Sequence, residues 1–225
     1  MKSEIFNTGS LEYLICYPDD YVEGERRPVL FFLHGAGTRG GNISRLQGNV
    51  FFGSVAKHVN FPFVIVAPHC PEESTWFDHF EQLKKLYTSL AEADFADPDR
   101  IYIMGLSMGG YGAWQLAMSC PEYTAAAVPI CGGGMYWNAG RLKNVPIWAH
   151  HGEIDNVVLL AESEKMVNAI NAQGGNARLT VYEGVAHPAW PKVYASWEVF
   201  EWLLSHKRSG AETAESGYND GTRFG

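Results

Sequence analysis

The chain has 225 residues, 46% of them hydrophobic and 19% charged, and a formal net charge of −8 at pH 7. Its length fits one sizeable α/β domain, and its composition is that of a folded globular protein, which excludes a disordered or fibrous chain. The negative charge and the lack of a Lys/Arg cluster exclude nucleic acid as an expected partner.

The N-terminal stretch MKSEIFNTGS lacks the apolar core of a signal peptide, and no apolar run is long enough to span a bilayer. We therefore expect a cytoplasmic protein that does not bind a membrane. A secreted protein whose signal had been removed would have the same sequence.

The cysteines are widely spaced, and no two of them form a CxxC pair. In a chain of this length they predict reduced, half-buried thiols, and the alternative is a disulfide between two of them. The four positions are Cys16, Cys70, Cys120 and Cys131.

Short apolar runs alternate with longer helix-like segments along the chain. Most runs are continuously apolar, which is typical of parallel strands covered on both faces. The predicted strands are 11–17, 28–34, 61–68, 100–104, 125–131, 146–150 and 178–182, and the predicted helices are 43–58, 76–94, 109–119, 160–173 and 192–206. This order predicts one α/β domain over residues 1–206, a mostly parallel sheet with helices on both faces, with ligand sites at the carboxyl ends of the strands.

The last segment, 207–225, is polar and Gly-rich and predicts a flexible tail. An arm that crosses a neighbouring chain is the alternative. Whether the chain forms a homodimer is therefore left open by the sequence.

The stretch IYIMGLSMGGYGAWQLAM places Ser107 between a predicted strand and a predicted helix. Gly105 to Gly109 match G-x-S-x-G, the nucleophile-elbow motif, in the strand–turn–helix setting that the motif requires. Such a turn crowds its neighbours, so the positions two before and two after the serine cannot carry bulky side chains. We expect Ser107 to be a nucleophile, and the alternative is a tight turn with a surface serine.

A serine needs a base beside it, and after an elbow the acid and the base follow in the order Asp, then His. WAHHGEIDNVV supplies Asp155 and LTVYEGVAHPAW supplies His187, each shortly after a predicted strand. Glu153 is the weaker candidate acid, and we interpret it as a residue that orients its loop. FFLHGAGTRGG follows another strand, and there the backbone N–H of Ala36, with that of Met108, predicts an oxyanion hole.

A metal site is the rival chemistry, because His150, His151, Glu153 and Asp155 lie close together in the sequence. No His or Cys pair recurs at a metal-binding spacing, and adjacent histidines of one strand point to opposite faces. The sequence predicts no metal and no cofactor.

The motifs HGAG, GLSMGGYGAW, HGEIDNVV and the EGVAH loop resemble those of the α/β-hydrolases over residues 28–206. More narrowly, they resemble small lidless esterases of the feruloyl esterase and polyhydroxybutyrate depolymerase-like branch, the carboxylesterase, acyl-thioesterase and dienelactone-hydrolase-like groups, and prolyl oligopeptidase catalytic domains. The resemblance implies an α/β-hydrolase fold with Ser107 as nucleophile, His187 as general base and then acid, and Asp155 as the residue that orients His187. Pro188 departs from many relatives and stiffens the histidine loop.

The segment between Cys131 and Val145 is too short for a lid, and an open cleft suits short-chain or aryl esters such as feruloyl-like ones, including esters linked to carbohydrate. Aromatic residues after the strands are the predicted cleft walls. They are Trp76, Phe77, Tyr136, Trp137 and Trp190. We therefore expect a serine carboxylesterase for small-molecule esters, and a prolyl-oligopeptidase-like peptidase, an acyl thioesterase and a non-catalytic binding protein are the alternatives.

Overall fold

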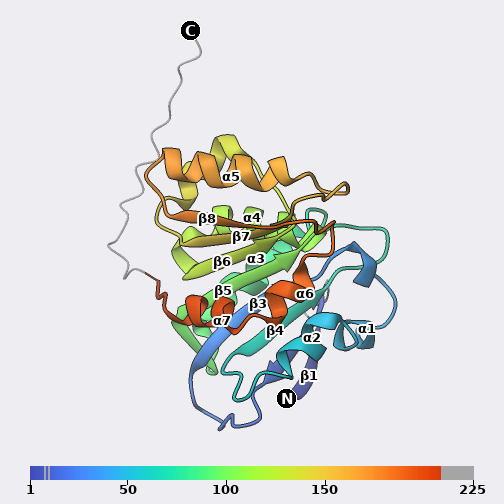
Figure 1. The fold of residues 1–225 in the computed structure, drawn as a ribbon. Coiled ribbons are helices and arrows are strands. Elements are labelled where there is room, and N and C mark those ends of the chain that lie inside the picture. The colour runs from blue at the N-terminus through green and yellow to red at the C-terminus, as the bar shows by residue number, and fades with distance from the viewer. Residues whose placement is uncertain (8, 10, 209–225) are drawn as a thin grey trace.

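The computed structural model describes residues 1–7, 9 and 11–208 (Figure 1). Over these residues eight strands form one sheet in the order β1-β2-β4-β3-β5-β6-β7-β8. β2 is antiparallel to its neighbours β1 and β4, and the other pairs are parallel. The strands are β1 (Lys2–Asn7), β2 (Glu12–Tyr17), β3 (Arg27–Leu33), β4 (Val64–His69), β5 (Ala96–Leu106), β6 (Ala126–Ile130), β7 (Ile147–Gly152) and β8 (Ala177–Tyr182).

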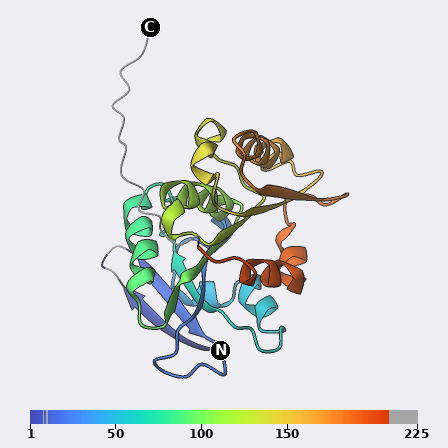
Figure 2. The ribbon, with the colours of Figure 1, turned by 90° about the vertical axis from the view of Figure 1, so that its left-hand side faces the viewer.

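Helices cover both faces of this sheet, as predicted (Figure 2). The α-helices are α1 (Ser44–Gln47), α2 (Val50–Val55), α3 (Phe80–Ser89), α4 (Met108–Ser119), α5 (Leu160–Ala172), α6 (Trp190–Ala195) and α7 (Trp197–Leu204), and the 3-10 helices are η1 (Ala36–Thr38), η2 (Leu90–Glu92), η3 (Pro121–Tyr123) and η4 (Tyr136–Leu142). One core layer packs under α3, α4 and α5, and the other under α1, α2, α6 and α7. Successive residues of β3 enter opposite layers, Phe31 the first and Phe32 the second, which is why the strand is continuously apolar.

Three predicted helices are shorter or divided in the structure. The segment 43–58 forms α1 and α2, because Asn49 is extended and its side chain caps α2 by accepting from the N–H of Phe51. The segment 192–206 is divided at Ser196, which has an extended backbone between α6 and α7. The segment 76–94 is helical only from Phe80, and ends in η2.

The first strand was not predicted, because it carries a weak signal. β1 is a polar edge strand that pairs with β2 on one side only and is mostly exposed. An exposed edge needs no run of apolar residues, so hydrophobic patterning does not reveal it.

Arg208, the last residue that the structure describes, is hydrogen-bonded to the domain. Its backbone N–H donates to the carbonyl of Asp99 at 2.8 Å, and its guanidinium contacts the Asp99 carboxylate at 3.2 Å. The rest of the predicted tail, 209–225, lies outside the described residues. No helix between residue 1 and residue 208 has both the length and the apolar character needed to cross a bilayer.

Candidate active site

Ser107 occupies a sharp turn between β5 and α4. Its backbone has φ 52° and ψ −116°, a left-handed conformation that is uncommon and costly for a residue with a side chain. The turn is held because the N–H of Ser107 donates to the carbonyl of Ile130 at 2.8 Å and its own carbonyl accepts from the N–H of Tyr111 at 3.0 Å. The side chain of Ser107 is thereby presented at the carboxyl end of the sheet.

The glycines of the motif are required by close backbone contacts. A Cβ atom on Gly105 would collide with the carbonyl of Gly109, and a Cβ atom on Gly109 would collide with the carbonyl of Leu33. On Gly110 it would lie 2.6 Å from the carbonyl oxygen of Ile130. The crowding expected from the sequence is therefore present on both sides of Ser107.

Three side chains from different strand ends form one chain of hydrogen bonds. His187 Nε2 lies 2.8 Å from Ser107 Oγ, and His187 Nδ1 lies 2.7 Å from Asp155 Oδ2. Because Nδ1 faces a carboxylate it carries the proton, which leaves Nε2 to accept from the Ser107 hydroxyl. The Asp155 side chain is fully buried and that of His187 is 15% exposed, so solvent reaches the histidine but not the acid.

The Asp155 carboxylate is held ionised by its surroundings. Its second oxygen accepts from the N–H groups of Val157 and Val158, both at 2.9 Å. Burial alone would raise the pKa of Asp155, but the hydrogen bonds from His187, Val158 and Val157 outweigh it and lower the pKa below its ordinary value.

A second imidazole contacts the same carboxylate. His151 Nε2 lies 3.3 Å from Asp155 Oδ2 and 2.9 Å from the carbonyl of Val158, and its Nδ1 lies 2.8 Å from Ser163 Oγ. The Ser163 hydroxyl also donates to the carbonyl of Gly132 at 2.9 Å. The sequence singled out His151 only as a metal candidate, and nothing in the sequence pointed to Ser163.

The loop that carries His187 is fixed from two neighbouring strands. Cys131 donates from its thiol to the carbonyl of His187 at 3.1 Å, and its backbone is left-handed at φ 47°. Glu153, which the sequence suggested as a residue that orients its own loop, accepts instead from the N–H of Gly184 in the loop after β8, at 2.8 Å. Trp190 packs edge-on against the His187 ring, with centroids 5.3 Å apart.

Cys131, His151 and Asp155 bring three potential metal-ligand atoms within 4.8 Å of one another. The chemistry of these donors does not suit a metal. Burial raises the pKa of Cys131 to about 11, which keeps a thiol where a metal needs a thiolate. Both ring nitrogens of His151 and both oxygens of Asp155 are already engaged within the protein.

The predicted oxyanion segment lies against the elbow. A Cβ atom on Gly35 would lie 3.5 Å from Ser107 Cβ, and Ala36 follows as the first residue of η1. Met108 is the first residue of α4, where helix N–H groups have no partner within the helix. Both predicted donors are thus backbone groups of segments that border Ser107.

His34 supports this segment as a neutral imidazole. Its Nδ1 donates to the carbonyl of Gly35 at 2.8 Å, and its Nε2 accepts from the N–H of Cys70 at 3.0 Å. Burial lowers the pKa of His34 to about 4. These contacts give His34 a structural role in the segment that precedes η1.

Besides Trp190, the predicted cleft aromatics separate into two groups. Trp76 is fully buried, its indole packs beside Gly112 of α4, and its Nε1 donates to the carbonyl of His34 at 3.0 Å. The prediction that Trp76 lines the cleft is therefore wrong, because a glycine in α4 leaves room for the indole in the core. Phe77, Tyr136 and Trp137 are 51%, 52% and 73% exposed.

The four cysteines are free and buried, so no disulfide joins them and burial is more complete than expected. His150 and His151 point to opposite faces of β7, as predicted. His150 contacts the Tyr182 hydroxyl at 3.0 Å, and burial lowers the pKa of His150 to about 3.

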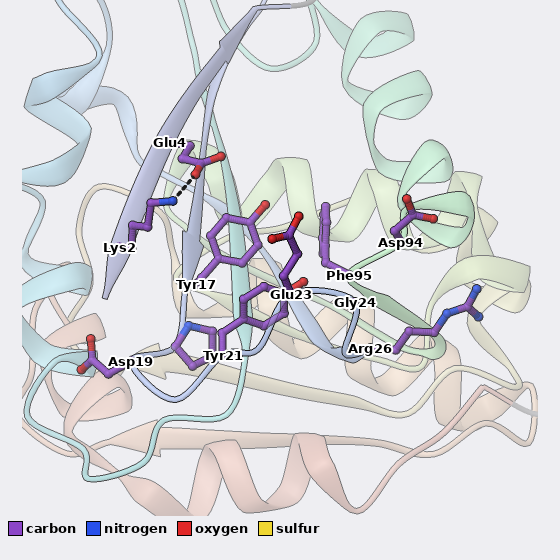
Figure 3. A pocket seen from close by; sticks show the side chains of 11 residues that line it. Lys2, Glu4, Tyr17, Asp19, Tyr21, Glu23, Gly24, Arg26, Asp94 and Phe95 are labelled. Carbon is purple, nitrogen blue, oxygen red and sulfur yellow. Dashed lines mark ion pairs between the residues drawn. The ribbon is translucent and has the colours of Figure 1, made fainter.

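A mixed polar and aromatic cavity of about 920 Å³ lies elsewhere, beside β1 and the segment before β3 (Figure 3). Its walls include Tyr17, Tyr21 and Phe95, together with Lys2, which pairs with Glu4 at 2.7 Å. The starts of β3 and β5 border it, whereas Ser107 follows the end of β5. The cavity therefore opens at the edge of the sheet opposite the hydrogen-bonded site.

Comparisons with known proteins agree on the fold. The model of the dienelactone hydrolase family matches residues 75–192. The crystal structure of a thermostable esterase aligns with a TM-score of 0.80 at 34% identity, over 92% of this chain and 63% of that chain. A candidate dipeptidyl aminopeptidase IV from Bacteroides ovatus aligns with a TM-score of 0.74 at 12% identity, over 91% of this chain and 35% of that chain.

Esterase Est2 from Thermogutta terrifontis, with bound butyrate, aligns with a TM-score of 0.66 at 18% identity, over 90% of this chain and 94% of that chain. No curated protein matches the sequence. The present chain spans less than two thirds of the thermostable esterase, at 63%, and about a third of the aminopeptidase, at 35%. These likenesses confirm the predicted α/β-hydrolase fold.

Proposed function

The chain belongs to the dienelactone hydrolase family, and from this premise we propose that it is a serine carboxylic-ester hydrolase that forms an acyl-enzyme on Ser107. The observation that carries the proposal is the chain of hydrogen bonds from Ser107 through His187 to Asp155, at 2.8 and 2.7 Å. A serine hydroxyl is a weak nucleophile unless a base takes its proton, and the imidazole lies within reach of that proton.

In the acylation half of the reaction, Ser107 Oγ forms a bond to the ester carbonyl carbon while its proton passes to His187 Nε2. The tetrahedral intermediate then collapses, the carbon–oxygen bond to the alcohol breaks, and the alcohol leaves with the proton from His187. Asp155 stabilises the imidazolium that forms between these steps, and its lowered pKa keeps it ionised for that purpose.

In the deacylation half, water takes the place of the alcohol and gives a proton to His187 as it attacks the acyl carbon. That proton returns to Ser107 Oγ as the acid leaves. The N–H groups of Ala36 and Met108 are the proposed donors to the oxyanion in both halves. They border Ser107 on either side, one from η1 and one from the first turn of α4.

The proposed substrates are short-chain or aryl esters of small molecules, including carbohydrate-linked esters. The connection from β6 to β7 consists of a short loop and η4, which supports an open site rather than one covered by a lid. The rings of Phe77, Tyr136 and Trp137 are exposed, and we propose that they make apolar contacts with the substrate. The butyrate found in Est2, a more distant structure, is consistent with a short acyl group.

The test is hydrolysis of p-nitrophenyl acetate, butyrate and octanoate and of methyl ferulate at pH 7.5 by the wild type and by Ser107→Ala. We expect turnover of short or aryl esters by the wild type and none above background by the variant. Equal rates in both proteins would remove Ser107 from the mechanism. Turnover of a dipeptide p-nitroanilide or of an acyl-CoA, but of none of the esters, would replace the proposal by a peptidase or a thioesterase.

A further inference from the structure

A cavity of about 500 Å³ opens along α4, on the face of the sheet covered by α3, α4 and α5. This volume lies within the range typical of small-molecule sites. The described residues that line it carry no charged side chain, and most of them are aromatic, apolar or glycine. They are Phe77, Phe80, Tyr111, Gln115, Gly133, Gly134 and Met135.

The cavity follows a stripe of α4 that begins at Ser107. Within this fully described helix, the residues that are not buried are Met108 and the series Tyr111, Gln115 and Ser119. Residues four apart share one face of a helix, so Tyr111 and Gln115 lie one and two turns beyond Ser107. At 1.5 Å per residue, Gln115 is about 12 Å from Ser107 along the axis.

Two of the other wall segments lie next in the sequence to residues that contact the proposed reaction centre. Phe77 follows Trp76, whose indole donates to the carbonyl of His34 beside the oxyanion segment. Gly133 follows closely after Cys131, whose thiol holds the carbonyl of His187. Two wall segments of the cavity therefore continue from residues that hold the proposed reaction centre.

The geometry separates the two halves of an ester. The leaving alcohol must lie next to His187 Nε2 to receive its proton. The cavity is lined from α4 and from residues 77–80 and 133–135, and its lining takes no residue from the loop between β8 and α6. The cavity thus lies on the acyl side.

Gln115, the lining residue farther along α4 from Ser107, carries an amide whose hydrogen-bond partner is defined. Gln115 donates from Nε2 to Ser119 Oγ at 3.1 Å, which leaves its amide oxygen Oε1 as an acceptor. Rings of Phe77 and Phe80 and the thioether of Met135 suit an aromatic guest. Gly133 cannot take a side chain without displacing its neighbours, because a Cβ atom there would lie 2.7 Å from Glu162 Cβ and 3.2 Å from Tyr111 Cε1.

We propose that this cavity binds the acyl part of the ester as an uncharged aryl group whose distal hydroxyl donates to Gln115 Oε1. This makes Gln115 a specificity-determining residue for phenolic acyl groups. The inference rests on the proposed esterase function and adds to it the acyl class and the residue that recognises it.

The experiment compares methyl 4-hydroxycinnamate with methyl cinnamate, two esters that share an alcohol and differ by one hydroxyl. We expect the wild type to favour the hydroxylated ester by about tenfold in kcat/KM, the size of one partly solvated hydrogen bond. In Gln115→Leu, which keeps the approximate shape and removes the acceptor, the ratio should fall to about one. The matched control is Gln47→Leu in α1, whose amide contacts Ser3 on the other side of the molecule, and which should keep the wild-type ratio.

Phe80→Ala provides a second, independent variant. It should lower kcat/KM for both aryl esters by more than it lowers kcat/KM for p-nitrophenyl acetate, because acetate is too small to reach that ring. Wild-type turnover of p-nitrophenyl acetate without discrimination between the two cinnamates would overturn this inference and leave the esterase proposal standing. An unchanged ratio of the two kcat/KM values in Gln115→Leu would overturn the role of Gln115. If the wild type hydrolysed none of the esters, the underlying esterase function would be overturned instead.

Discussion

Asp155 lies between two His–Ser pairs, which differ in what they can do. The exposed side is His187 with Ser107, and the buried side is His151 with Ser163. On one side His187 lies 2.7 Å from the carboxylate and 2.8 Å from Ser107 Oγ. On the other, His151 lies 3.3 Å from the same oxygen and 2.8 Å from Ser163 Oγ. Interatomic distances alone would permit a nucleophile on either side.

Two features separate these sides. The His187 side chain is 15% exposed, whereas that of His151 is fully buried, so a substrate can meet only the first. Ser107 stands on a strained turn at φ 52°, whereas Ser163 is buried inside α5 and donates to the carbonyl of Gly132. A hydrogen-bonded Ser–His–Asp group therefore needs access and a free hydroxyl proton before it can act.

The largest expected effect is on the exposed side. Ser107→Ala should lower kcat by about 10⁵- to 10⁶-fold, because it removes the proposed nucleophile to which the acyl group becomes attached. A fluorophosphonate should add to the wild type once, with the adduct mapped to Ser107 by peptide mass spectrometry. Adduct on Ser163, or labelling that persists in Ser107→Ala, would show that the two sides are not separated as described.

Asp155→Asn should have the next largest effect, because it acts on both imidazoles. The amide cannot hold His187 in the tautomer that leaves Nε2 free, and kcat should fall by about 10⁴-fold. Esterase assays on a variant whose circular dichroism matches the wild type would measure this loss. A fall of less than tenfold would contradict the orienting role.

The same variant predicts a pH dependence of stability. The pKa of Asp155 is lowered in the folded protein, so its ionised form stabilises the fold above the unfolded pKa of about 3.9, and this contribution is lost as the pH falls through the folded pKa. The difference in urea midpoint between wild type and Asp155→Asn should be largest at neutral pH and should narrow below about pH 4. A constant difference would mean that the carboxylate charge does not carry the effect.

The elbow is the second feature that separates the sides, and Gly109→Ala tests it. The added methyl group would collide with the carbonyl of Leu33, so we expect at least about 3 kcal/mol of destabilisation from displaced backbone. The matched control is Gly53→Ala in α2, where a Cβ atom meets nothing within 4 Å. This substitution should stabilise the helix by up to about 1 kcal/mol. Equal urea midpoints for the two variants would contradict the close packing of the turn.

The sequence was enough to predict which residues meet on the exposed side, because its signals are local. Gly105, Ser107 and Gly109 lie within one turn, and Asp155 and His187 follow strands that are recognisable by their apolar runs. Chain order then placed them together at one edge of the sheet. These signals need no knowledge of which helix packs against which loop.

The buried side could not be predicted, because it depends on contacts distant in the sequence. Ser163 matters only because α5 packs it between His151 and the carbonyl of Gly132. Trp76 was misplaced for the same reason, since its burial depends on the space beside Gly112. A side chain's pattern in the sequence says little when its environment comes from another element.

The smallest expected effect is on the buried side, and it is one of stability. Ser163→Ala removes the donor to Gly132 and the hydroxyl that faces His151, and a buried carbonyl left unpaired costs about 1–3 kcal/mol. Activity should stay within about tenfold of the wild type, because the His187 side keeps its own contacts with Asp155. Ser205→Ala, which removes an exposed hydroxyl bonded to the carbonyl of Trp202, is the control and should change stability by less than about 0.5 kcal/mol. A loss of activity in Ser163→Ala as large as that in Asp155→Asn would mean that the buried imidazole takes part in orienting the exposed one.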